Sequence, residues 1–243
     1  LPLGVLTTSM IVPILPRFTA AVNTASTEEL QVEYFRALRF LWFATLPAAA
    51  IAAAIARPAI KLLFKGEAFN DESVDLVTMA LLFQLPSMFF YVARDLTMRV
   101  FYAYRDMKTP FIIACASLAL NAIFDVIFAV ILKMDVAGIS LSTSVVTAIG
   151  FVALKIKLAR HQKLPFAQLF FPVCRMALSA LLSWYLADQA VSLASQHGPG
   201  GWIGAFLTVL AGVSAGGTAY IMMSLLIKSE EILLLLRQVG IIK

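Results

Sequence analysis

The sequence predicts an all-α membrane protein, a bundle of six full transmembrane helices with part of another helix before them. Of its 243 residues, 61% are hydrophobic and only 14% are charged, far below the quarter that is usual for soluble domains. The net charge is +5, but the basic residues lie between apolar runs rather than in one patch. This pattern is typical of polytopic membrane proteins and argues against a nucleic-acid partner.

The N-terminal segments differ from the six full spans. Residues 1–16 predict the second half of a spanning helix that is interrupted by two prolines. Residues 17–39 are amphipathic, with Leu30, Tyr34 and Leu38 on one face, and predict a helix that lies on the membrane surface. Because the chain starts at a leucine without the basic start of a signal peptide, we expect it to be a fragment.

The six full spans follow from apolar runs of about 20 residues, the length that crosses a bilayer. They are expected at 40–56, at 77–104, in the two arms of a hairpin over 109–154, at 166–191 and at 202–227. Residues 1–164 thus hold the partial helix, the surface helix and four spans, and residues 165–243 hold two spans and an interfacial tail. Gly212 and Gly216 in the last span form a GxxxG pattern, which favours close helix packing.

The charge of the connections predicts the orientation. Twelve Lys and Arg residues lie on one side of the membrane and four on the other, which places the first side in the cytoplasm. The first set occupies 17–39, 105–108, 155–163 and 228–243, and the second occupies 57–65, 133 and 188–201. The C-terminus is therefore expected in the cytoplasm.

One face of the hairpin's first arm carries Asn121 and Asp125, four residues apart and so one helical turn apart. Folding the hairpin at residues 134 and 135 predicts that Asp125 is level with Thr143 and Ser144. An ionisable residue at this depth is costly unless it has a partner or a function. Two interpretations stay open: a structural clamp of hydrogen bonds, or a site for a monovalent cation or a proton, since oxygen ligands suit hard cations and burial favours protonation.

A second polar group lies in the span at 77–104. Asp95 and Arg99 are one turn apart, which predicts an internal salt bridge with Arg99 reaching toward the cytoplasmic interface. The alternative is that Arg94, Asp95 and Arg99 line a water-filled cavity that attracts an anionic headgroup. Guanidinium groups suit phosphates because they donate paired hydrogen bonds.

The stretch RVFYAYRDMKTPF, residues 99–111, closely resembles a signature of the MurJ (MviN) family of lipid II flippases, within the superfamily of multidrug, oligosaccharidyl-lipid and polysaccharide exporters. The matching positions are Arg99, Phe101, Tyr102, Ala103, Asp106, Thr109 and Pro110. The segments NAIFD and AGISLSTS resemble those of cyanobacterial and plastid-type members. The resemblance implies that the chain is the C-terminal half of a fourteen-helix transporter. It also implies that residues 1–164 form the transporter lobe and that residues 165–243 form two added helices and an interfacial tail.

The resemblance also implies a function and a site. The family moves a peptidoglycan precursor, lipid II, across the membrane by alternating access, and no enzymatic activity or cofactor is expected beyond Na+ or H+ as the coupling ion. Its sodium site corresponds here to Asn121, Asp125, Thr143 and the carbonyl of Ile139. Spans five and six would line a groove for the lipid tail. The partners implied are lipid II, membrane lipids and the missing N-terminal half, without which this chain should not transport.

Three other functions stay open at this stage. The same fold could serve a polysaccharide-lipid or multidrug exporter, or a non-transporting membrane scaffold. An intramembrane enzyme is disfavoured, because it would need converging acid, base or metal groups, and the last four spans offer only Asp125 and peripheral charges. The expected location is the bacterial inner membrane, or the plastid inner envelope in a plant or alga.

Overall fold

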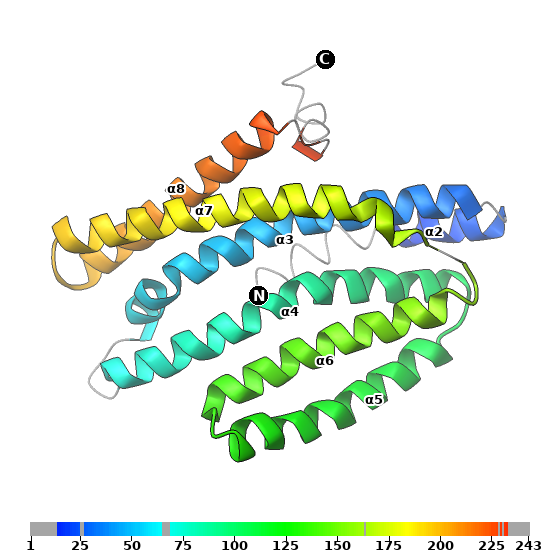
Figure 1. The fold of residues 1–243 in the computed structure, drawn as a ribbon, viewed down its shortest axis with the longest axis horizontal. Helices are drawn as coiled ribbons and strands as arrows, with labels where there is room; N and C mark the ends of the chain where they lie inside the picture. The colour runs from blue at the N-terminus through cyan, green and yellow to red at the C-terminus, as the bar shows by residue number, and fades with distance from the viewer. Residues whose placement is uncertain are drawn as a thin grey trace. The chain divides into compact units, whose positions relative to one another are not determined.

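A computed structural model describes residues 14–24, 27–64, 69–162, 164–227, 229 and 231–232, and all its long elements are helices (Figure 1). In chain order these are α2 (Ile14–Asn23), α3 (Thr27–Phe64), α4 (Asp71–Ala103), α5 (Lys108–Asp125), the π-helix η1 (Val126–Ile131), α6 (Asp135–Leu158), the 3-10 helix η2 (Phe166–Leu169), α7 (Phe170–His197) and α8 (Gly201–Leu226).

The prediction of six full spans is confirmed. Six helices in the described part of the chain are long and apolar enough to cross a membrane. Five of them match the predicted spans within a few residues at most ends, with α5 and η1 together forming the third. The partial first helix and the interfacial tail fall mostly on residues outside the described ones.

The first span is longer than predicted, because α3 runs without a break from Thr27 to Phe64 through two internal prolines. The expectation of a separate helix on the membrane surface is therefore wrong. Its apolar stripe is buried against protein instead: Leu30 and Leu38 are at most 2% exposed and Tyr34 is fully buried. Tyr34 shares a hydrogen bond of 2.8 Å with Thr97 of α4, so this stripe faces another helix and not lipid headgroups.

The helices form two compact units. The first unit comprises the described residues up to Thr45 together with Phe83–Phe170. Its α4, α6 and α5 lie side by side, with α6 in the middle (Figure 1). Ser144 of α6 donates a hydrogen bond of 2.6 Å to the carbonyl of Phe83, close to Pro86, where α4 lacks one backbone donor.

The second unit comprises Leu46–Leu82 and the described residues from Phe171 onward. Here the predicted GxxxG contact is confirmed, because Gly212 and Gly216 are buried and a Cβ at either position would lie 2.7 Å or less from an isoleucine of α3. Ser183 of α7 adds a hydrogen bond of 2.8 Å to the Gly216 carbonyl. The division at residue 164 into a lobe and two added helices concerns function and stays a prediction.

Candidate cation site and substrate cavity

The hairpin forms as predicted, with α5 and η1 antiparallel to α6. Its turn falls at residues 133–135, where Lys133 and Asp135 both have a positive φ, 53° and 49°. A left-handed residue is costly for most side chains, and two of them here reverse the chain within three residues. The turn therefore fixes which levels of α5 and α6 face each other.

The facing levels differ from the predicted ones. Asn121 donates a hydrogen bond from Nδ2 to the Ser142 hydroxyl at 2.9 Å, and Ser142 donates in turn to the Asn121 carbonyl at 3.2 Å. Asn121, and not Asp125, is therefore level with the consecutive hydroxyl residues 142–144 of α6. The prediction that Asp125 is level with Thr143 and Ser144 is wrong by about one turn, because Asn121 occupies that level. Ser144 hydrogen-bonds to α4 instead.

Ser142 was missed in the sequence, although it lies in the same hydroxyl run as Thr143 and Ser144. It is fully buried, whereas Thr143 is partly exposed. In a helix, neighbouring residues point about 100° apart, so only a fixed register could tell which of the three hydroxyls faces α5. The spacing of Asn121 and Asp125 alone does not supply that register.

The Asp125 carboxylate is the unsatisfied group of this hairpin. Its Oδ1 atom is buried and has no hydrogen-bond partner among the described residues. A buried charge without a partner is costly, so this oxygen is available to a cation or a proton. The unpaired oxygen fits the cation interpretation better than a fully satisfied structural clamp.

The other residues of the implied site lie on α6. The Thr143 hydroxyl donates to the Ile139 carbonyl at 3.1 Å, so these two oxygens lie together. Donation uses the hydroxyl proton and leaves the oxygen lone pairs of Thr143 for a cation. In the part of the chain that the structure describes, no three His, Cys, Asp or Glu side chains could hold a metal ion. The hydroxyl and carbonyl oxygens of Thr143 and Ile139 are of the type that suits a hard cation.

The predicted salt bridge in α4 is present. Arg99 Nη2 lies 3.5 Å from Asp95 Oδ2, and both side chains are mostly buried. The Nε atoms of Arg99 and Arg94 are buried without hydrogen-bond partners among the described residues. The structure therefore keeps unused guanidinium donors on one helix of the first unit.

Arg94 lies where the three neighbouring helices of this unit meet. A Cβ built on Gly150 of α6 would lie 3.6 Å from Arg94 Cδ and Nε and 3.2 Å from the Ser117 hydroxyl of α5. Arg94 therefore passes over a glycine, close to a hydroxyl in the middle of the hairpin. A larger residue at position 150 would press on both of these side chains.

Comparison with known proteins identifies the family. The sequence profile described as "Lipid II flippase MurJ" matches residues 1–223. The chain belongs to the MurJ family. It is 30% identical to the probable lipid II flippase MurJ of Thermotoga maritima over 196 residues, which is 81% of this chain and 38% of that protein. It is also 30% identical to the Synechocystis sp. counterpart over 127 residues, 52% of this chain and 24% of that protein.

The fold agrees with this assignment. A solved structure of a lipid II flippase MurJ in an inward closed conformation superposes with a TM-score of 0.69 and 21% identity. The match covers 92% of this chain and 43% of that one. The chain thus corresponds to less than half the length of the MurJ proteins it matches, and with its six apolar helices it is a multi-pass membrane protein.

The signature stretch of this MurJ-family chain forms the connection from α4 to α5. Arg105, just after the end of α4, has a φ of 59°. The Asp106 amide donates a hydrogen bond of 2.9 Å back to the Phe101 carbonyl, which is the pattern of a Schellman cap. The Asp106 carboxylate then accepts a hydrogen bond of 2.9 Å from the Thr109 amide at the start of α5. Hydrogen bonds from Thr109 hold the pKa of Asp106 below its usual range. The Asp-x-x-Thr spacing is thus a helix cap.

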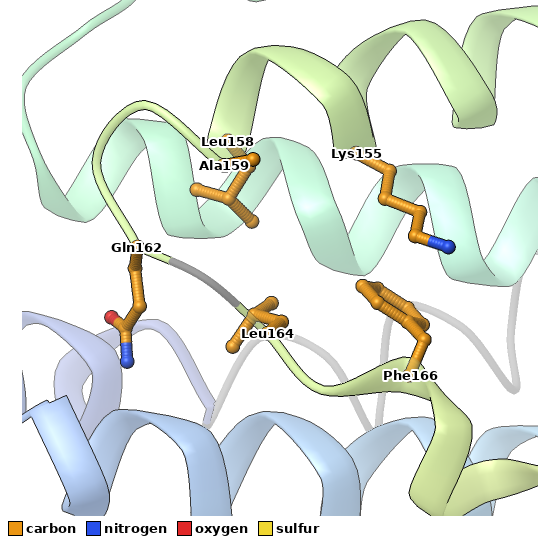
Figure 2. A pocket seen from close by; sticks show the side chains of 6 residues that line it. All are labelled: Lys155, Leu158, Ala159, Gln162, Leu164 and Phe166. Atoms are coloured by element: carbon orange, nitrogen blue, oxygen red, sulfur yellow. The ribbon is translucent and has the colours of Figure 1, made fainter.

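A pocket of about 280 Å³ is lined by the end of α6 and the segment that follows it (Figure 2). The ammonium of Lys155 lies 4.2 Å from the centre of the Phe166 ring. Gln162, the buried polar residue of the lining, donates to the Thr27 carbonyl at 2.6 Å and accepts from the Tyr104 hydroxyl at 3.1 Å. Because Gln162 is committed to these neighbours, it ties α3 to the end of α4.

Proposed function

We propose that this chain is the C-terminal lobe of a lipid II flippase, which works together with the helices that its longer relatives carry outside the matched segment. The observation that carries the proposal is the profile match to the lipid II flippase family over residues 1–223. The six spanning helices supply the architecture that transport across a membrane needs. No chemical step is required of the protein, since the cargo changes sides and not structure.

In this proposal Arg94 and Arg99 attract the pyrophosphate of the lipid-linked precursor. Their buried Nε atoms lack partners among the described residues, and guanidinium groups bind phosphates through paired hydrogen bonds. Asp95 holds Arg99 on the helix at 3.5 Å and limits its reach. Helices α7 and α8 would hold the lipid tail in a groove, which leaves the polar headgroup to the first unit.

A monovalent cation, Na+ or H+, would couple transport through Asp125. The ion would be held by the unpaired Oδ1 of Asp125, by the side-chain oxygen of Asn121 and by the oxygens of Thr143 and Ile139, which lie together on α6. It would neutralise a carboxylate that is costly to bury. Its arrival or departure therefore changes the relative stability of two arrangements of the hairpin, which is what alternating access requires.

The proposed location is the inner membrane of a bacterium, or the inner envelope of a plastid, with the C-terminus in the cytoplasm. The support is the excess of basic residues in the connections on that side. In this orientation the signature connection at residues 104–107 faces the cytoplasm, while the hairpin turn at residues 133–135 faces the opposite side.

The test is complementation by the full-length protein in bacterial cells that are depleted of their own lipid II flippase. Wild type is expected to restore growth, and Asp125→Asn to fail at normal membrane levels, because the amide keeps the shape but loses the charge. The matched control is Asp135→Asn, which changes an exposed acid of the hairpin turn, where Asn tolerates the positive φ. Failure of the wild type would refute the flippase assignment, and full growth with Asp125→Asn would remove the coupling site.

A further inference from the structure

We propose that Gly138 is a positioning residue for the cation site, acting through the π-helix that follows Asp125. We call this π-helix, η1 (Val126–Ile131), the wide turn. The inference rests on the proposed function, which places a monovalent cation at Asp125. It adds a residue that contributes no ligand atom and yet sets where the carboxylate lies.

The wide turn starts at the residue directly after Asp125. In it the Leu132 amide donates to the Ile127 carbonyl, five residues back, at 2.9 Å, where an α-helix would bond four residues back. Such π-helical turns make up well under 1% of residues in proteins and occur frequently at functional sites. If residues 126–131 continued α5 as a regular α-helix, different side chains of this segment would face α6.

Gly138 packs directly on the backbone of the wide turn. A Cβ at this position would lie 2.7 Å from the Ala129 nitrogen and 2.7 Å from the Phe128 carbonyl carbon. Carbon atoms do not approach backbone this closely, and the backbone of a helix cannot rotate away as a flexible side chain can. Glycine is therefore the residue that lets α6 touch the wide turn.

Two contacts between α5 and α6 fix the level of Asp125. The hydrogen bonds between Asn121 and Ser142 hold the helices one turn before it. The contact of Gly138 with the backbone at Phe128 holds them one turn after it. Asp125 lies between these two points, so its backbone can shift along or away from α6 only if one of them opens.

A larger residue at position 138 would push the two helices apart on one side of Asp125 only. The contact at Asn121 would stay, and the hairpin would splay toward its turn. Because a cation needs its ligand oxygens within a few tenths of an ångström of ideal distances, the site should lose affinity even though every ligand is still present. Tight packing without a positioning role predicts lower stability but unchanged affinity.

The experiment measures sodium affinity through thermal stability. The full-length protein in detergent is unfolded at increasing NaCl concentration, with choline chloride keeping ionic strength constant. Gly138→Ala is expected to raise the half-saturating NaCl concentration about tenfold, which corresponds to ~1.4 kcal/mol. The matched control is Gly217→Ala, a helical glycine whose Cβ would meet nothing within 4 Å, and it should leave that concentration unchanged.

The outcomes separate this inference from the proposed function. If Gly138→Ala lowers stability but keeps the wild-type half-saturating concentration, Gly138 only packs, and the inference is overturned while the cation site stands. If wild type shows no sodium response, or Asp125→Asn keeps it, the sodium site at Asp125 falls and the inference with it, while the flippase proposal is judged by complementation.

A measurement on the wild type covers the case in which Gly138→Ala does not fold. Hydrogen exchange of the amides at 126–132 is compared in NaCl and in choline chloride. Sodium bound at a carboxylate that the wide turn positions should slow exchange across this segment several-fold. Equal exchange in both salts, with a sodium-dependent melting temperature, would refute the positioning role.

Discussion

Replacing Asp106 tests whether the family signature is a structural cap. Asp106→Ala removes the carboxylate that accepts a hydrogen bond of 2.9 Å from the Thr109 amide. Loss of such a cap costs about 1 kcal/mol of stability. Asp106→Asn keeps an oxygen in the same place, and Asn caps helices nearly as well as Asp. The expected order of stability is therefore wild type, then Asp106→Asn a few tenths of a kcal/mol lower, then Asp106→Ala.

The pH dependence follows from the same contact. Hydrogen bonds from Thr109 hold the pKa of Asp106 below its usual value, which is about 3.9 in an unfolded chain. The stabilisation by the charged carboxylate is thus fully present above that unfolded value and is lost as pH falls through the lower folded value. Asp106→Asn carries no charge and so never has this stabilisation. The stability of wild type should therefore approach that of Asp106→Asn in acid.

The assay is thermal unfolding in detergent, followed by circular dichroism at pH 7 and at stepwise lower pH. For a chain of this size 1 kcal/mol corresponds to about 2–4 °C in melting temperature, so Asp106→Ala should melt a few degrees lower at pH 7. Equal losses in Asp106→Asn and Asp106→Ala would show that the acceptor geometry is irrelevant. A constant gap between wild type and Asp106→Asn at every pH would refute the lowered pKa.

Two further predictions concern buried contacts, one in each unit. In the first unit, Thr97 donates to the Ala93 carbonyl at 2.6 Å and accepts from the buried Tyr34 hydroxyl. Tyr34→Phe should therefore cost about 1 kcal/mol, and an unchanged melting temperature would show that this bond is dispensable. In the second unit, Gly216→Ala should cost about 1–3 kcal/mol, because its Cβ would lie 2.7 Å from Ile51 Cγ1. Gly217→Ala should instead be neutral or up to ~1 kcal/mol more stable, and equal losses in both variants would exclude the close contact.

The spanning helices could be predicted because each one is encoded locally. Runs of about 20 apolar residues leave few alternatives in a bilayer, and all six were found. The error at α3 has a physical reason. An amphipathic stripe such as Leu30, Tyr34 and Leu38 looks the same in sequence whether it faces lipid headgroups or the side of another helix, and only the contact with Thr97 decides.

The candidate site was less predictable because it depends on register between helices. The sequence supplied Asn121 and Asp125 on one face, and the structure leaves Asp125 Oδ1 without a partner among the described residues. The sequence could not show that Ser142 is the partner of Asn121, or that Gly138 packs on the backbone of the wide turn. Both contacts follow from where the hairpin turns and from an extra residue in one helical turn. Neither can be predicted from hydrophobic periodicity.

The wide turn also bears on how residues are matched between relatives. A π-helical turn holds one residue more per hydrogen-bonded ring than an α-helical turn. A homologue with a regular helix after its counterpart of Asp125 would therefore have one residue fewer before its counterpart of Ile139. An alignment without a gap in this segment would then assign the α6 ligands to positions one residue away, about 100° around the helix. A comparison with such a homologue should place a one-residue gap between 126 and 131.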